Sequence, residues 1–70
     1  MQDLQRAVGK LVRAARHARG WSQDVLADRS GLHRAHIGEI ERGEVNVSIQ
    51  TLHTLAQTLK VRLRDFIPDV

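Results

Sequence analysis

The stretch QDVLADRSGLHRAHIGEIER, residues 23–42, decides the fold of this chain. Apolar residues recur in both halves with the spacing of one helix face, and Gly31 and Leu32 lie between the halves, where a tight turn between two helices needs a glycine. Ala27 is small enough for two helix backbones to approach there, and Ile37 and Ile40 can fix the second helix to the rest of the molecule. The stretch therefore predicts two short helices that cross at a steep angle.

Helical patterns also lie upstream and downstream of the turn. Residues 4–15 repeat apolar side chains on one helix face with basic side chains opposite, which predicts an amphipathic helix that ends near Gly20. Ser22 is the expected N-cap of the second helix, which should stop at Gly31. The third helix should run from His33 to about Arg42.

The remaining residues predict two more helices. Gly43 ends the third helix, and Ser48 is the N-cap of a fourth. A short fifth helix follows in residues 61–66 and ends before Pro68. No strand alternation, repeat or linker is visible, so we expect one domain, residues 1–70, folded as a compact all-α bundle of five helices. The apolar face of the fourth helix should consist of Ile49, Leu52, Leu55, Ala56 and Leu59.

Length and composition exclude several classes of protein. The chain has 70 residues, of which 41% are hydrophobic and 27% charged, as in a small globular domain. It contains no cysteine, which excludes disulfides, thiolate zinc sites and a cysteine nucleophile. No apolar run is long enough to span a membrane, and residues 1–6 do not resemble a signal peptide. We expect an intact cytosolic protein that needs no cofactor and is not an enzyme, because no set of nucleophile, base and oxyanion donors is present.

Positive charge is concentrated near the start of the chain. The formal net charge is +3, and Asp3 is the sole acidic residue in residues 1–20. A local basic excess suits a polyanionic partner, but charge alone leaves nucleic acid as one candidate among several. The basic residues of this segment are Arg6, Lys10, Arg13, Arg16 and Arg19.

Three segments of the chain resemble a known family. These are RGWSQ (19–23), ADRSGL (27–32) and IGEIERG (37–43), and together they resemble the helix-turn-helix domain of the Cro and C1 repressor type, also called the XRE family. The resemblance covers the chain from about Val8 to Phe66, with the helix-turn-helix motif at about residues 23–42. It implies a lambda repressor-like fold and sequence-specific binding to double-stranded DNA. The run RGEVNVS (42–48) favours the controller proteins of restriction–modification systems over phage repressors.

The third helix is the expected reading element. With Ile37 and Ile40 toward the core, the outward face mixes residues that have no stabilising purpose of their own. In the major groove, Arg34 can donate two hydrogen bonds to guanine, and Ala35 can touch a thymine methyl group. Glutamate accepts from cytosine but repels phosphates, so Glu39 either excludes wrong sequences or is a bystander. The predicted base-reading residues are Arg34, Ala35, His36, Gly38 and Glu39.

Phosphate contacts are expected from other positions. Gln23 opens the second helix, whose free N–H groups and positive dipole end suit a phosphate oxygen. Asn46 and the backbone after Gly43 form a second clamp, although the family usually has a proline here and often a basic residue at position 44 or 45. The predicted phosphate contacts are Arg16, Ser22, Gln23, His33, Arg42 and Asn46.

Arg16 and Glu41 lie at matching edges of the apolar faces of their helices. An ion pair between them would fix the recognition helix to the first helix, whereas the alternative is two unrelated surface charges. The family resemblance adds that such an arginine also touches phosphate.

Other residues have competing interpretations. His33, His36 and Glu39 follow a spacing of three, but they fan around the helix, so we predict no metal site. Trp21 is either a core residue, which we favour, or a stacking platform. Arg6, Lys10 and Arg13 are either a second DNA surface or, as we favour, a solvated helix face.

These observations predict a DNA-binding transcriptional regulator that acts as a homodimer. One recognition helix reads few base pairs, so two copies are needed for specificity. The dimer contact is expected at Leu63, Ile67 and Val70 together with the exposed side of the fourth helix. The alternative is a protein-interaction module with a protein partner, such as an antitoxin-like domain, which Glu39 and Glu44 beside the DNA-binding face favour.

Overall fold

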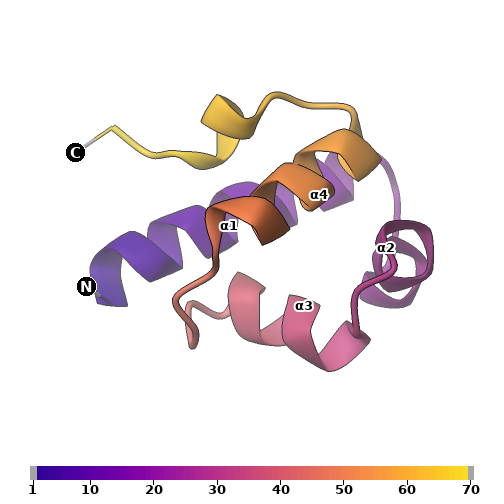
Figure 1. Cartoon of the computed structure of the whole chain (residues 1–70), viewed down its shortest axis with the longest axis horizontal. Coiled ribbons are helices and arrows are strands. Elements are labelled where there is room, and N and C mark those ends of the chain that lie inside the picture. The colour runs from indigo at the N-terminus through magenta and orange to yellow at the C-terminus, as the bar shows by residue number, and fades with distance from the viewer. Residues whose placement is uncertain (1, 70) are drawn as a thin grey trace.

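The computed structural model describes residues 2–69 and is helical, with no strand in that range. Four α-helices, α1 (Gln2–Ala18), α2 (Gln23–Ser30), α3 (Arg34–Glu41) and α4 (Ile49–Leu59), precede a 3₁₀-helix, η1 (Leu63–Phe66) (Figure 1). The all-α prediction is confirmed. The predicted fifth helix is a single 3₁₀ turn of 4 residues, closed by a hydrogen bond from the Arg62 N–H to Asp65 Oδ2 at 3.0 Å. None of these helices in the described part is long and apolar enough to cross a membrane.

The predicted caps set the ends of the central helices. The Ser22 hydroxyl accepts from the Val25 N–H at 3.1 Å, and the Ser48 hydroxyl accepts from the Thr51 N–H at 3.0 Å. Gly31 ends α2 with φ of 78°, the left-handed conformation that favours glycine. His33 occupies the N-cap position of α3 but makes no side-chain capping bond.

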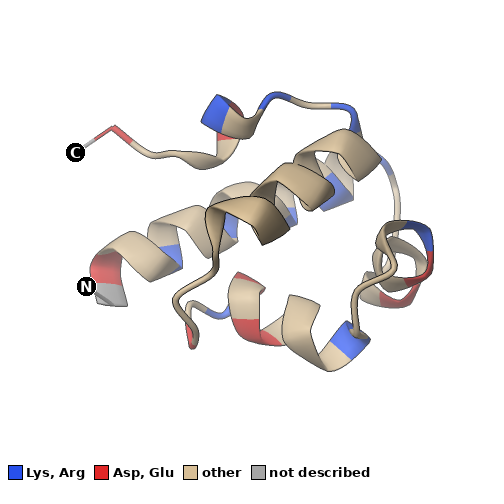
Figure 2. Cartoon of the chain, viewed as in Figure 1, with Lys and Arg blue, Asp and Glu red and all other residues tan. Residues whose placement is uncertain are grey.

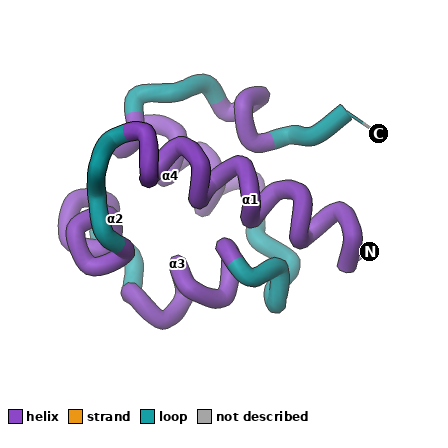
Figure 3. Tube along the Cα trace, turned by 180° about the vertical axis from the view of Figure 1, so that it is seen from behind, coloured by secondary structure: helices purple, strands orange, loops and turns teal. Residues whose placement is uncertain are grey.

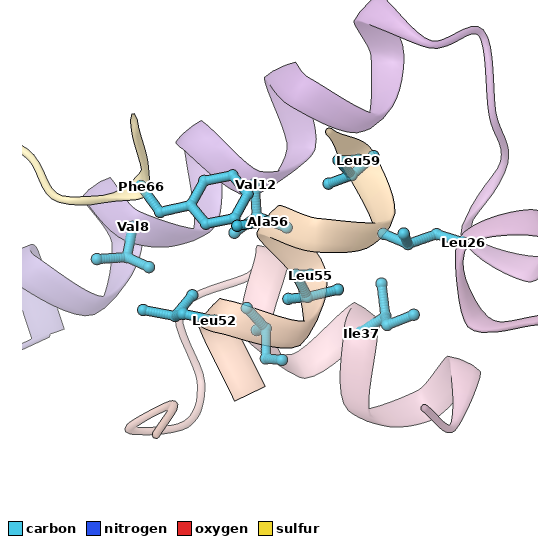
Figure 4. Close-up of a cluster of buried hydrophobic side chains, with 10 residues drawn as sticks. Val8, Val12, Leu26, Ile37, Leu52, Leu55, Ala56, Leu59 and Phe66 are labelled. Atoms are coloured by element: carbon cyan, nitrogen blue, oxygen red, sulfur yellow. The ribbon is translucent and has the colours of Figure 1, made fainter. Parts of the chain in front are cut away.

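One hydrophobic core joins all five helices. Figure 4 shows Val12 of α1, Leu26 of α2 and Ile37 of α3 gathered around α4. The expected face of α4 is correct for four residues, but Ile49 is 63% exposed because it lies in the first turn, where the chain enters the helix from the surface. The buried apolar residues are Val8, Val12, Leu26, Ile37, Ile40, Leu52, Leu55, Ala56, Leu59 and Phe66.

Helix α1 approaches α3 closely at Gly9. A Cβ atom at Gly9 would lie 2.6 Å from the carbonyl oxygen of Glu41 and would also meet that of Ile40. Glycine is therefore needed here for space. The close approach places the end of α3 beside α1, along which basic residues are distributed (Figure 2).

Candidate nucleic-acid interface

Helix α3 presents one side to solvent and buries the other. It lies at an edge of the molecule, with α4 and α1 on one side of it (Figures 1 and 3). Ile37 and Ile40 are buried, whereas Arg34 and Ala35 are exposed and His36 and Glu39 are half-buried. The residues expected to read bases are thus accessible, with the exception of Gly38.

Gly38 is buried, which corrects the expectation that it lies open on the reading face. Arg42 lies over this position, since its Nη1 would lie 2.9 Å from a Cβ atom at Gly38. Arg42 bends back over the helix and forms two hydrogen bonds with Glu44, from Nε to Oε2 at 2.9 Å and from Nη2 to Oε1 at 3.1 Å. This pairing raises the pKa of Arg42 and lowers the pKa of Glu44, chiefly through the hydrogen bonds.

Arg34 forms a different kind of ion pair. Its Nε lies 2.8 Å from Oδ1 of Asp24, which is in the first turn of α2. Both side chains are largely exposed, at 63% for Arg34 and 76% for Asp24. The contact therefore links the start of α3 to the start of α2 without burying either group.

The remaining expected DNA contacts surround this face. His36 Nδ1 lies 3.4 Å from Oε1 of Glu39, a long contact between half-exposed groups. His33 and Asn46 are exposed, at the two ends of the segment that contains α3. Within residues 2–69, no group of three potential metal ligands is arranged to hold an ion.

Behind α3, Arg16 and Glu41 form a bidentate ion pair. Nε and Nη2 of Arg16 donate to the Glu41 carboxylate at 2.8 and 2.9 Å, and Nη1 donates to the Trp21 carbonyl oxygen at 2.9 Å. The side chains are only 8% and 3% exposed. The expected phosphate contact of Arg16 does not fit this geometry, because all three nitrogens of its guanidinium point into the protein.

This network holds Glu41 in its ionised form. Burial disfavours the carboxylate, but hydrogen bonds from Arg16 and Gln23, together with the positive charges of Arg16 and Arg13, outweigh burial and lower the pKa of Glu41 below its ordinary value of 4.5. The hydrogen bond to Glu41 in turn raises the pKa of Arg16. The pair is therefore charged over the physiological pH range.

Gln23 belongs to the same network. Its Nε2 donates to Oε1 of Glu41 at 3.1 Å, so the side chain is half-buried and partly committed to the protein. The Ser22 hydroxyl accepts from Val25, which leaves the N–H groups of Gln23 and Asp24 outside the intrahelical pattern. The start of α2 can thus offer backbone donors even while the Gln23 amide holds Glu41.

Trp21 packs half-buried against the core, as the favoured interpretation expected. Two guanidinium groups also lie over its ring, with the Cζ atoms of Arg19 and Arg29 at 5.6 and 4.7 Å from the ring centroid. The sequence analysis missed this arrangement, because Arg29 comes from the far end of α2.

Comparison with known proteins supports a helix-turn-helix assignment. A family model described as Helix-turn-helix matches residues 12–66. The chain belongs to this family. The XRE-type resemblance drawn from the sequence is thereby confirmed.

Several relatives of this helix-turn-helix chain are restriction–modification controllers. It is 44% identical over 57 residues to the control protein C.SmaI of Serratia marcescens, a match that covers 81% of this chain and 68% of that protein. The crystal structure of the controller C.AhdI from Aeromonas hydrophila is similar with a TM-score of 0.86 and 38% identity, over 90% of this chain and 96% of that one. The controller C.Esp1396I, solved as a tetramer with its natural 35 base-pair operator, is similar with a TM-score of 0.82 and 32% identity, over 90% of this chain and 83% of that one.

Proposed function

We propose that this protein is a sequence-specific, double-stranded DNA-binding transcriptional regulator of the restriction–modification controller type. It acts in the cytoplasm by occupying an operator and catalyses no reaction. The observation that carries the proposal is the outward face of α3, where Arg34 and Ala35 are exposed while Ile37 and Ile40 anchor the helix from behind. The relatives named as controllers support the same function.

The recognition helix reads bases through its first turns. Arg34 donates two hydrogen bonds to a guanine, and Ala35 contacts a thymine methyl group. His36 and Glu39 flank them and restrict which neighbouring base pairs fit. Gly38 approaches the bases only when Arg42 moves away from it, which makes its contribution dependent on Arg42.

Phosphates are held around this face. Gln23 and the free N–H groups at the start of α2 take one phosphate, with Ser22 beside them. His33 and Asn46 contact the strands at the two ends of the recognition helix. Arg42 joins them when it exchanges the Glu44 carboxylate for a phosphate oxygen, which is feasible because both groups are exposed.

The protein binds DNA as a homodimer, because one α3 reads too few base pairs for useful specificity. Ile67 is 49% exposed and lines an apolar groove with Leu4 and Ile49, the other exposed large hydrophobic residues within the described part of the chain. Leu63 packs against its own core and offers less to a partner, and Val70 lies outside the described residues. We therefore place the dimer contact at this groove. Sedimentation of Ile67→Ser should show more monomer than the wild type.

Binding to duplex DNA over a salt series tests the proposal. The wild type should select one sequence from a randomised duplex library and bind it at least about 10³-fold more tightly than random duplex, with a steep loss of affinity in salt. Arg34→Ala should relax the preference at one base pair, whereas Gln23→Ala should weaken binding to all sequences alike. Absence of binding at low salt would instead support the protein-interaction module.

A further inference from the structure

We infer that Asp24 is a positioning residue for base reading, which aims the Arg34 guanidinium into the groove by holding its Nε side. The inference rests on the proposed function and adds to it a residue of the preceding helix. Asp24 touches no base in this scheme. It acts through Arg34.

The geometry of the ion pair leaves the terminal nitrogens of Arg34, Nη1 and Nη2, available for a base. Asp24 Oδ1 is 2.8 Å from Nε, the nitrogen nearest the aliphatic stem. None of the hydrogen bonds within residues 2–69 engages any nitrogen of Arg34, so its contact with Asp24 is an ion pair without hydrogen-bond geometry, and the Arg34 side chain is 63% exposed. A bidentate contact with guanine O6 and N7 needs two donors of one guanidinium edge, so Arg34 can keep Asp24 and still present its terminal nitrogens.

Arg42, at the C-terminal end of α3, has a guanidinium that is engaged by hydrogen bonds. Glu44 takes both Nε and Nη2 of Arg42, and the guanidinium lies folded over Gly38. Arg42 therefore has its Nε–Nη2 edge occupied, and its Nη1 lies close to Gly38. Within the described residues, no hydrogen bond occupies either edge of the Arg34 guanidinium, which distinguishes the two arginines.

Asp24 itself is well placed to serve as a fixed support. It lies in the first turn of α2, where the helix dipole favours a negative charge. Helix α2 is capped at both ends, by Ser22 and by Gly31, and Leu26 fixes it in the core. The backbone that carries the carboxylate is therefore fixed, and the ion pair lets Arg34, the first residue of α3, lose fewer rotamers on binding a base.

The pair also restrains Arg34 on wrong sequences. Without Asp24, the arginine could swing to a nearby phosphate, a contact that any sequence supplies. With Asp24 present, that swing breaks an ion pair and leaves a carboxylate facing the phosphates. The expected result is a larger affinity difference between guanine and the other bases at one position.

The test compares Asp24→Asn with Asp28→Asn, which removes the same charge one turn further along α2, where Asp28 is exposed. Each variant is used to select binding sequences from a randomised duplex library. Affinities are then measured for duplexes that differ only at the base pair whose preference Arg34→Ala relaxes. Asp24→Asn should reduce guanine discrimination there by about 2- to 10-fold, the range expected for ordering one long side chain. Asp28→Asn should leave that discrimination unchanged.

A double-mutant cycle identifies the route of the effect. In the Arg34→Ala background, Asp24→Asn should no longer alter base preference. Equal effects of Asp24→Asn and Asp28→Asn, or an effect of Asp24→Asn that persists without Arg34, would overturn the inference. If the wild type binds no DNA, or Arg34→Ala relaxes no position, the proposed function fails first. Thermal melting should show that both asparagine variants remain folded, since both sites are exposed.

Discussion

The two sides of α3 each carry an arginine–carboxylate pair, and the two pairs differ in burial. Arg16 and Glu41, behind the helix, are 8% and 3% exposed, whereas Arg34 and Asp24, on the solvent side, are 63% and 76% exposed. A buried pair that loses one partner leaves a charge without water, so it holds the helix in place. An exposed pair is worth about 0–1 kcal/mol, so it can orient a side chain without locking it.

Removing the carboxylate of the buried pair should have the largest effect. Glu41→Ala should lower the free energy of unfolding by about 3 kcal/mol, because Arg16 and Gln23 lose their shared acceptor. Urea denaturation measures this change. Asp24→Ala is the matched control and should lower stability by less than about 1 kcal/mol. Similar losses for the two variants would mean that burial does not separate the pairs.

Gly9 tests the close approach that brings Arg16 to Glu41. Gly9→Ala should destabilise the protein by about 2 kcal/mol, because the added Cβ meets backbone carbonyl oxygens that can move only with the whole of α3. Ala7→Gly on the same helix is a useful control for helix propensity. It should cost about 1 kcal/mol without any clash. A neutral Gly9→Ala would show that α1 and α3 can separate freely.

Acid should remove the stability that the buried pair contributes. The pKa of Glu41 is lowered in the folded protein, so its contribution to stability is present above the ordinary pKa of 4.5 and is lost as pH falls through the lower folded pKa. Glu41→Gln should therefore flatten the acid limb of a stability–pH curve measured by chemical denaturation. Glu44→Gln should leave that limb nearly unchanged, because its pair with Arg42 is exposed.

The smallest effect is expected at Gly38, on the side of α3 where Arg42 lies. Gly38→Ala should raise stability by about 0.5 kcal/mol, because alanine favours the helix and the new Cβ meets only the flexible end of Arg42. Thermal unfolding measures the gain. The contrast with Gly9 is informative, since both glycines are helical and buried. A loss as large as that of Gly9→Ala would mean that Arg42 is fixed over the helix.

Local sequence predicted the helices well for a physical reason. The caps Ser22 and Ser48, the turn at Gly31 and the apolar periodicity all act within a few residues, so no tertiary information is required. The ion pair of Arg16 with Glu41 could also be anticipated, because both residues lie at the edge of an apolar face. The DNA-reading roles assigned to α3 remain predictions.

Two kinds of feature could not be predicted from the sequence. One is a contact between segments far apart in the chain, and the other is the rotamer of a long side chain. Gly9 has no signal of its own in an amphipathic pattern, and its importance follows from the path of α3 across α1. The burial of Gly38 depends on the rotamer of Arg42, and the exposure of Ile49 depends on where α4 enters the core. The pairing of Asp24 with Arg34 depends on the angle between α2 and α3.

The amino-acid sequence by itself thus determined which segments are helices, where they stop and which face of each is apolar, since these follow from hydrogen bonding and hydrophobicity within one or two helical turns. Only the tertiary structure decided which charged side chains pair and how deeply each pair is buried. The crossing of the helices sets whether an arginine meets its carboxylate in a dry contact, as Arg16 does, or in water with its terminal nitrogens free, as Arg34 does. The strength of a charge interaction depends on that surrounding, which no single segment specifies.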